Sequence, residues 1–530
     1  MSESAKKQSF LHGTALLAMS TAIVKIIGAF YSIPLKGIIG DQAFGYYSTA
    51  YEIYTLLLMI STAGLPVAMS RMISEASSLE KYRQVRKIYA TARTIFLTLG
   101  ILGTVLMMVF CRQLADFQRQ PNAWVTILAL GPACLLICLM STYRGYFQGQ
   151  SNMKPTSVSQ VMEAAVKLVC GLGFAGLLLW NTSNKAYAAG GAIFGVTMSC
   201  LVSSIYLSRC FHKSYQDLPA GADTADTGKT IAKSLLAIAI PITIGSVGLH
   251  ILTVLETRVY MSQLLGFMSQ ESADLQKGIY NFIQKIFNMP CAFITPITIS
   301  IIPAITAQIT TGDLKGAKAT EESAARVTAL ISMPCAVGLA VLAEPITALL
   351  GGYTGTNLAL ATNLMRVLGI CIIFNATVLL TNAIMQSHGH VNLPVVNMFI
   401  GGFLKLGAIA ILTGNKHIGI LGTPIGSLLC YLSITVLNVF TVRRVLPDPP
   451  AIVKNMLRGG LAAMIMGIGT FGAWYGLKFI GIGSRLILCG APIGVGVILY
   501  VIAAVKLKAI TREDCLLLPK GKKIADLLHL

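Results

Sequence analysis

The sequence predicts an all-α polytopic membrane protein with about 14 transmembrane helices, arranged as two six-helix pseudo-twofold lobes plus two C-terminal helices. Three observations support this class. Hydrophobic residues make up 55% of the 530 residues and charged residues only 12%, a balance that a water-soluble domain of this size does not need. About fourteen apolar stretches are long enough to cross a hydrocarbon core as helices, and an open sheet is excluded there because its edges would stay unpaired. Finally, charged residues repeat along the chain.

The repeat separates residues of equivalent character by an almost constant distance. A spacing of 233 residues relates three pairs: Lys25 and Arg258, Glu52 and Lys285, and Arg93 and Arg326. A neighbouring stretch repeats at 238 residues and matches Lys167 with Lys405. Parallel repeats of this length are typical of transporters whose two halves are related by an axis along the membrane normal. Ligands are then expected between the halves.

The predicted helices follow the chain in order. In the first lobe they cover about 10–34, 43–69, 92–111, 123–144, 157–180 and 187–208. In the second lobe they cover about 232–260, 279–307, 327–350, 360–386, 392–413 and 418–441, and the additional pair covers about 456–478 and 484–505. The expected domains are an N-terminal lobe at 1–210, a cytoplasmic linker at 211–230, a C-terminal lobe at 231–445, two further helices at 446–505 and a basic cytoplasmic tail at 506–530.

Basic residues predict the orientation. Most of the 41 Lys and Arg residues fall in the termini and loops of one side when both termini are placed in the cytoplasm, as the positive-inside rule requires. Lys277 is counted with the outer loops in this arrangement. The prediction is a multi-pass protein of the cell (cytoplasmic) membrane. The net charge of +20 then needs no nucleic-acid partner, because basic loops beside an anionic leaflet account for it.

Charged residues inside predicted helices are the candidates for function, since burying a charge in a membrane costs a few kcal/mol and marks a pair or a polar path. The candidates are Lys25, Glu52, Glu163, Lys167, Glu256, Arg258, Lys285 and Lys405. Positive charges outnumber negative ones in this set. A net-cationic interior favours an anionic ligand.

Four of these residues are candidates for gating or ion pairing. Glu52 and Lys285 occupy equivalent places in the two repeats, so they either pair across the interface between the lobes or bind a ligand or ion. Glu163 and Lys167 are spaced i, i+4 on one helix, which favours an internal ion pair.

The other four have no such obvious partner. Lys25 and Arg258 are the best candidates for contacting an anionic ligand, because a guanidinium binds two phosphate oxygens at once and an ammonium acts as a mobile point charge. Glu256 and Lys405 are candidates for ion coupling. His388 and His390 lack further ligands nearby, so no metal site is expected.

Several stretches resemble a known family. They are Gly45-Tyr46, Gly64-Leu65-Pro66-Val67-Ala68, Arg144-Gly-Tyr-Phe-Gln-Gly149, Pro155-Thr-Ser-Val-Ser-Gln-Val161 and Gly422-Thr-Pro-Ile-Gly426. They are similar to the stage V sporulation protein B and MurJ-type lipid II flippase group of the multidrug/oligosaccharidyl-lipid/polysaccharide exporter superfamily. The resemblance covers nearly the whole chain.

The resemblance implies a MATE-like fold, in which two lobes surround a cavity that alternates in access. It places cavity cations on the helices that hold Lys25, Arg258 and Lys285, with Arg71 as a further substrate-binding candidate, whereas Glu52 departs from an all-cationic pattern. The implied substrate is an undecaprenyl-pyrophosphate-linked glycan for peptidoglycan, spore cortex or surface polysaccharide. The protein would then be a transporter and not an enzyme.

The resemblance leaves the coupling and the partners to be predicted. No cofactor is expected, and Na⁺, H⁺ or the membrane potential would drive transport. The expected partners are the lipid bilayer, the lipid-linked glycan and cell-wall synthesis proteins, with the chain itself a monomer. Two alternatives remain: a cation-coupled multidrug exporter of the same superfamily, with Glu52, Glu163 or Glu256 as the ion site, and a membrane scaffold that transports nothing.

Overall fold

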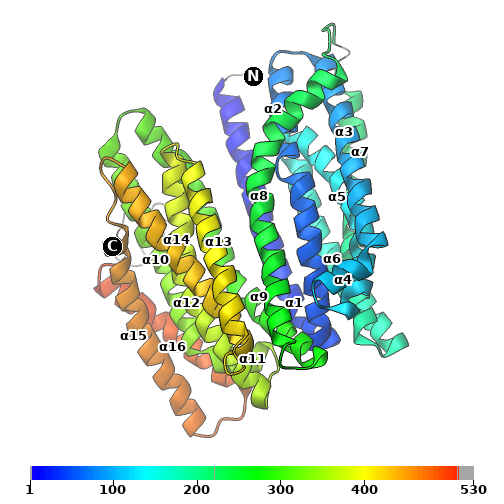
Figure 1. Ribbon diagram of the computed structural model, residues 1–530. Helices are drawn as coiled ribbons and strands as arrows, with labels where there is room; N and C mark the ends of the chain where they lie inside the picture. Colours follow the sequence, from blue (N-terminus) through cyan, green and yellow to red (C-terminus); the bar gives the residue numbers. More distant parts are fainter. Residues whose placement is uncertain (1–2, 220, 510, 512–530) are drawn as a thin grey trace. The chain divides into compact units, whose positions relative to one another are not determined.

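Helices form every regular element of the part of the chain that the structure covers (Figure 1). The structure is a computed structural model that describes residues 3–219, 221–509 and 511, apart from the side chains of 3–18, 22, 25, 29, 61, 245, 246, 249 and 296–300. The prediction of an all-α membrane protein is confirmed. The helices form two compact units, residues 1–281 and 282–530.

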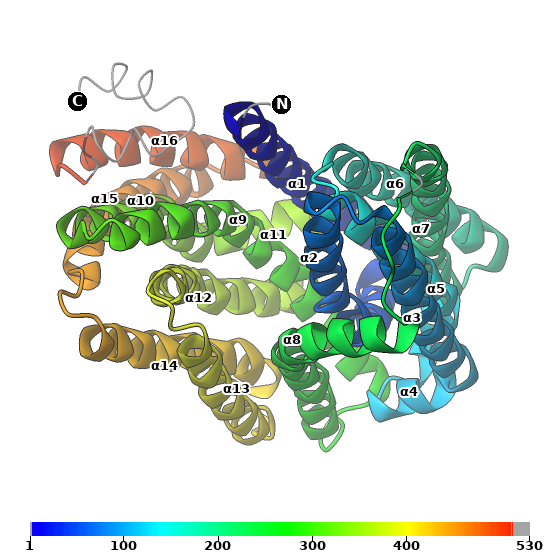
Figure 2. The same ribbon diagram turned by 90° about the horizontal axis from the view of Figure 1, so that it is seen from above.

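The first unit contains the candidate site. Its elements in chain order are α1 (Glu3–Thr62), α2 (Leu65–Ser78), α3 (Tyr82–Val109), α4 (Cys111–Phe117), η1 (Pro121–Ala123), α5 (Trp124–Gly149), α6 (Lys154–Thr182), α7 (Lys185–Gln216), α8 (Gly228–Leu264) and the start of α9 (Gln270–Thr310). Helix α5 packs against α1, α2, α3 and α7, while α8 packs against α1, α2 and α3 (Figure 2). The first unit therefore extends beyond the predicted lobe at 1–210.

Helix α1 contains the predicted span at 10–34 and most of the predicted span at 43–69 in one helical run. Its only described non-helical residue is Gly40, with φ 77° and ψ 173°, a conformation that is essentially restricted to glycine. The chain thus passes from the segment ending at residue 39 to the segment beginning at residue 41 without a loop. A second break follows Thr62, because Pro66 lies in the first turn of α2, where its missing N–H costs no hydrogen bond.

Close glycine contacts fix α6 against α7. A Cβ atom added at Gly195 would overlap the backbone of Gly171, and one at Gly191 would lie 2.7 Å from the carbonyl oxygen of Phe174. Small residues let two membrane helices approach at backbone distance. Helix α6 is therefore held closely against α7, and it also packs against α1.

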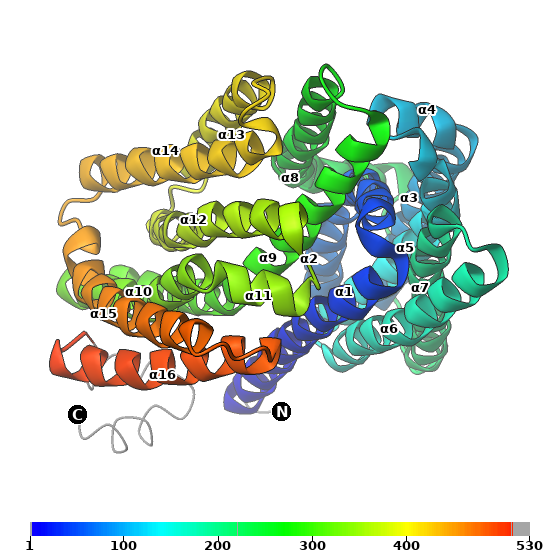
Figure 3. The same ribbon diagram turned by 90° about the horizontal axis from the view of Figure 1, so that it is seen from below.

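The second unit contains the rest of α9 and seven further α-helices: α10 (Leu314–Val341), α11 (Ala343–Leu350), α12 (Gly355–Ser387), α13 (Asn392–Thr413), α14 (Gly422–Val445), α15 (Ile452–Phe479) and α16 (Arg485–Lys506), with η2 (Gly419–Leu421) before α14. Helix α12 packs against α10 and α14, and α15 lies between α10 and α16 (Figure 3). Asparagines join three helices: Asn438 Nδ2 donates to Asn382 Oδ1, and Asn397 Nδ2 donates to Asn438 Oδ1.

Eleven helices of the described chain are long and apolar enough to cross a membrane. Helices α8 and α9 are not among them, although they contain the predicted spans at 232–260 and 279–307. The predicted linker at 211–230 is shorter in the structure, because α7 continues to Gln216 and α8 begins at Gly228. The two compact units are defined by how the helices pack, whereas the predicted domains were defined by the sequence repeat. The predicted domain boundaries therefore stay a prediction. Most of the expected tail at 506–530 lies outside the described residues.

Candidate functional site

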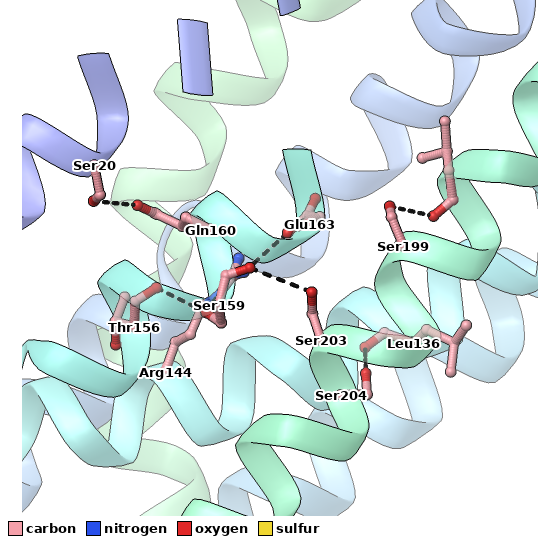
Figure 4. A network of polar contacts seen from close by, with 11 residues as sticks. Ser20, Leu136, Arg144, Thr156, Ser159, Gln160, Glu163, Ser199, Ser203 and Ser204 are labelled. Carbon is pink, nitrogen blue, oxygen red and sulfur yellow. Dashed lines mark hydrogen bonds and ion pairs between the residues drawn. The ribbon is translucent and has the colours of Figure 1, made fainter. Parts of the chain in front are cut away.

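A cavity with charged residues in its lining lies inside the first unit, between the two segments of α1, the end of α5 and the first half of α6. Its volume is about 290 Å³. The lining is mixed, with charged, amide, phenolic and aliphatic side chains: Thr21, Val24, Ile27, Gly28, Tyr31, Tyr51, Arg144, Gln160, Glu163, Ala164 and Lys167. Gln160 accepts a hydrogen bond from Ser20 of α1 at 3.2 Å (Figure 4). The cavity thus contains three charged residues among helices that are otherwise mostly apolar.

Arg144 and Glu163 form an ion pair in this cavity. Arg144 Nη2 donates to Glu163 Oε2 at 2.9 Å, and Arg144 Nε donates to Ser159 Oγ at 3.1 Å (Figure 4). The side chains are only 15% and 25% exposed. Ser203 of α7 donates to the carbonyl oxygen of Ser159. The α6 turn that orients Arg144 is therefore itself anchored on α7.

The close ion pair of Glu163 is with Arg144, whereas Glu163 interacts with Lys167 only at longer range, so the predicted pairing along α6 stays a prediction. The i, i+4 spacing allows such a pair, but pairing along one helix contributes only about 0.2–0.5 kcal/mol. A guanidinium–carboxylate hydrogen bond is stronger, at about 1.5–3 kcal/mol. Because α5 brings Arg144 to the carboxylate, Glu163 forms its close ion pair across helices and not along α6.

Lys167 instead contacts tyrosines. Its Nζ donates to the hydroxyl of Tyr51 at 2.7 Å and lies 4.5 Å from the centroid of the Tyr51 ring. The ring of Tyr31 is 5.3 Å away, and the Tyr31 hydroxyl donates to the Ala192 carbonyl oxygen of α7. Both segments of α1 therefore contribute an aromatic face to this ammonium group, an arrangement that stabilises a desolvated cation.

A second polar cluster surrounds Lys277 near the start of α9. The Lys277 side chain is fully buried, although the sequence placed it in an outer loop. Its Nζ lies 2.5 Å from Thr49 Oγ1 and 3.9 Å from Glu52 Oε2. Glu52 also accepts a hydrogen bond from Thr257 of α8 at 2.8 Å. Glu52 thus has a cation within its own unit, while its expected pairing with Lys285, a residue of the second unit, stays a prediction.

Asp274 is the other carboxylate of this cluster. It accepts hydrogen bonds from the Tyr46 hydroxyl at 3.0 Å, from Gln120 Nε2 at 3.0 Å and from Gln270 Nε2 at 2.9 Å. Three donors satisfy most of the acceptor capacity of a buried carboxylate. Gln118, in the same loop as Gln120, is fully buried, and neither atom of its amide has a hydrogen-bond partner among the described residues.

The cluster joins two segments related by the repeat spacing. Asp41 and Gly45 match Asp274 and Gly278 at 233 residues. A Cβ added at Gly278 would overlap the carbonyl group of Asp41, and one at Gly45 would lie 3.3 Å from the carbonyl oxygen of Asp274. The start of α9 therefore crosses α1 at backbone distance.

The remaining predicted residues do not gather in the cavity. Arg258 of α8 donates from Nη1 to the carbonyl oxygen of Phe117 at 2.6 Å, and its guanidinium carbon lies 4.4 Å from the Phe117 ring centroid. A cation at the C-terminal end of a helix, here α4, is stabilising. Arg258 thus anchors α8 on the α4 end, and ligand binding by Arg258 stays a prediction.

The other candidates are dispersed. Lys25 lies in α1, and its side chain is outside the described set. Arg71 is exposed on α2, and Glu256 is buried in α8. Lys285 and Lys405 are half-buried in the second unit. Their roles in substrate binding and ion coupling stay predictions.

Sequence reasoning missed Arg144, Tyr31 and Tyr51. Arg144 ends the predicted span at 123–144 and begins the Arg144–Gly149 motif that carried the family resemblance, but it was not among the candidate site residues. Its spacing from Glu163 crosses a helix connection, so no single-helix pattern could link them. Tyrosines are amphipathic and are equally compatible with packing and with a site.

Comparison with known proteins identifies the family of the chain. Residues 10–308 match a family model described as polysaccharide biosynthesis protein. Stage V sporulation protein B of Bacillus subtilis (strain 168) is 26% identical over 451 residues, which are 83% of this chain and 85% of that protein. Lipid II flippase MurJ of the same organism is 25% identical over 412 residues, which are 75% and 76% of the two chains. The resemblance found in the sequence is thus confirmed.

Solved structures agree on the fold. A lipid II flippase MurJ structure in an inward closed conformation matches with a TM-score of 0.67 at 15% identity and covers 92% of this chain and 98% of its own. An inward-facing multidrug resistance MATE family transporter of the MOP superfamily matches with a TM-score of 0.62 at 15% identity and covers 80% and 97%. The chain therefore has the MATE-like fold of a multi-pass membrane protein. The orientation of its termini stays a prediction.

Proposed function

The chain belongs to the polysaccharide biosynthesis protein family, and from that premise we propose that it is a flippase that moves an undecaprenyl-pyrophosphate-linked glycan from the inner to the outer leaflet. The observation that carries the proposal is the cavity between α1, α5 and α6, which contains two cations and one carboxylate. Lipid II or a related precursor of peptidoglycan, spore cortex or surface polysaccharide is the proposed substrate. Stage V sporulation protein B and MurJ, the relatives with about a quarter identical residues, support this substrate class.

Charge selects the substrate in this proposal. Arg144 and Glu163 neutralise each other, and Lys167 leaves the cavity with one net positive charge. Ionisable groups within membrane helices are costly and mark the path of a charged substrate. A pyrophosphate group fits that path, whereas a lipophilic cation is repelled by it.

The membrane potential supplies a sufficient drive. An inside-negative potential of 100 mV favours outward movement of an anion by about 2.3 kcal/mol for each charge. A pyrophosphate therefore needs no nucleotide hydrolysis to accumulate in the outer leaflet. Na⁺ or H⁺ ions that move together with the substrate would change the net charge moved and therefore the free energy that the membrane potential supplies. Coupling to these ions is part of the proposal only through that change.

The second candidate is a cation-coupled multidrug exporter. The likeness to the MATE transporter structure favours it, as does the presence of a carboxylate, Glu163, in the cavity. Its weakness is that Arg144 occupies this carboxylate. A cation would have to displace the guanidinium first.

Complementation tests the proposed function. Cells depleted of their own lipid II flippase are expected to grow when they express this chain, and lipid II becomes accessible to a reagent added outside the cells. The matched control is Lys25→Ala, which we expect to reach the membrane in equal amount and to leave lipid II inside. Full-length protein in the membrane without rescue and without external lipid II would reject lipid II as the substrate. Efflux of a cationic dye in the same cells would then favour the multidrug exporter.

A further inference from the structure

Lys167 is a half-buried cation whose contacts at hydrogen-bonding and cation–π distance are neutral, while the carboxylate of Glu163 acts on it from farther away. The neutral contacts are the hydroxyl of Tyr51 at 2.7 Å, the face of the same ring at 4.5 Å and the face of Tyr31 at 5.3 Å. Within the described part of the chain, no carboxylate oxygen lies within 4.0 Å of its ammonium nitrogen. Glu163, one turn earlier on α6, forms its close ion pair with Arg144.

The ammonium group keeps donors for a ligand. It has three N–H donors and no acceptor, and one of them is used by Tyr51. The tyrosine faces stabilise the charge by their quadrupoles but accept no strong hydrogen bond. Because Lys167 lines the cavity, its remaining N–H groups are available to a group that enters there.

The charged residues of the cavity determine which charge a ligand group must have to bind there. The pair of Arg144 and Glu163 is neutral, so Lys167 supplies the net charge of the cavity. A cation without a carboxylate in direct contact is unfavourable at membrane depth, and an anion that enters lowers that cost while it gains a charge-assisted hydrogen bond. A second cation meets repulsion instead.

We propose that the cavity between α1, α5 and α6 binds an oxyanion, a phosphate, pyrophosphate or carboxylate group, through Lys167. The Tyr51 hydroxyl holds the ammonium in place, and the Gln160 amide, which also lines the cavity, offers a second donor. Small-molecule sites usually measure about 300–1,000 Å³, so a cavity of about 290 Å³ takes a head-group fragment and not a whole glycan. The proposal rests on the proposed function only in naming a lipid-linked pyrophosphate as the physiological source of the anion.

Binding to purified protein in lipid nanodiscs tests the site directly. The probes are inorganic pyrophosphate and farnesyl pyrophosphate, titrated by calorimetry. We expect wild type to bind and Lys167→Met to bind about tenfold to hundredfold more weakly, which corresponds to one lost charge-assisted hydrogen bond. Lys154→Met, which removes an exposed lysine from the first turn of the same helix, is the matched control and should bind as wild type does. Lys167→Arg should retain part of the affinity.

The outcomes are distinct. Equal affinity of Lys167→Met and wild type overturns the proposal, as does a wild type that binds neither probe. Tight binding of tetraphenylphosphonium that pyrophosphate does not displace also overturns it, because the cavity would then accept cations. If Lys167→Met does not fold, Lys167→Gln keeps a polar head in its place and must show the same loss of affinity. Stronger binding of the farnesyl probe supports a lipid head group as the source, and equal binding of both probes supports a free anion.

The test separates this site from the proposed function. A chain that fails complementation but binds pyrophosphate through Lys167 refutes the flippase and leaves the anion site standing. A chain that rescues the cells equally well with Lys167→Met, and whose affinity for pyrophosphate is unchanged by that substitution, refutes the anion site and leaves the flippase standing.

Discussion

Replacing Gly278 by alanine tests how tightly α9 crosses α1. A Cβ at Gly278 would overlap the carbonyl carbon and oxygen of Asp41, and these backbone atoms cannot rotate away as a side chain can. The two helices must therefore separate. Forcing an extra methyl group into a well-packed contact costs about 1–3 kcal/mol or more, and the better helix propensity of alanine returns about 1 kcal/mol.

Gly45 offers a matched control on the other helix of the crossing. It is the repeat equivalent of Gly278, it also lies within a helix, and a Cβ there would lie 3.3 Å from the carbonyl oxygen of Asp274 and 3.5 Å from Gln120 Nε2. These distances require a shift of only a few tenths of an ångström, so the propensity gain should roughly offset the crowding. We expect the two alanine variants to differ in stability by about 2 kcal/mol.

Thermal unfolding in detergent measures the difference. Gly278→Ala should melt below wild type, and Gly45→Ala should melt at or above it. Faster hydrogen exchange near residues 41–47 in Gly278→Ala alone would locate the damage at the crossing. Equal melting temperatures for the two variants, or a stabilised Gly278→Ala, would refute the close contact inferred from the structure.

Two further changes probe the polar contacts of the first unit. Lys277→Met should lower stability by about 3 kcal/mol because it removes the buried ammonium group that lies 3.9 Å from the half-buried Glu52 carboxylate. Melting curves should show partial recovery in the double variant with Glu52→Gln, and no recovery would mean that the two do not interact. In the linker, slight desolvation raises the pKa of the Asp223 carboxyl. The backbone N–H groups of Arg83 and Gln84 donate hydrogen bonds to this carboxylate and lower its pKa, and the net result is a pKa below the ordinary value. The Asp223 carboxylate therefore stabilises docking fully above the unfolded pKa of about 4, and the contribution disappears as pH falls through the lower folded value. Limited proteolysis of 217–227 should therefore increase only below about pH 4. If Asp223→Asn shows the same pH profile, the Asp223 carboxylate is not the cause of this pH dependence.

Hydrophobic patterning predicted the helices better than it predicted their ends. The span at 10–34 lies in α1, and the span at 43–69 runs from α1 into α2, because runs of apolar residues determine which segments enter a membrane. Patterning placed Lys277 in an outer loop and Arg144 at the very end of a span, since each lies at the edge of an apolar run. In the structure Lys277 is buried and Arg144 reaches into the cavity. A long side chain extends beyond the position of its own Cα, and a window average does not register that reach.

Partner choice was the part of the site that the sequence could not determine. The spacing of Glu163 and Lys167 permits an ion pair, but which cation wins depends on the distance between α5 and α6 in space. That distance is decided by tertiary packing, in which Gly171 and Gly195 hold α6 against α7. For Lys25 the sequence repeat alone identifies the residue as a candidate, and its predicted contact with an anionic ligand stays a prediction.

The single-residue junction at Gly40 makes the two segments of α1 mechanically dependent on each other. With no intervening loop there is no slack, so a rotation of residues 19–39 about their axis must appear at once as a displacement of residues 41–62. Tyr31 stands before the junction and Tyr51 after it, and both touch the Lys167 ammonium. Any movement of one segment against the other therefore opens or tightens the aromatic enclosure of that cation. Lengthening the junction by two or three glycines should uncouple the segments while leaving each helix intact.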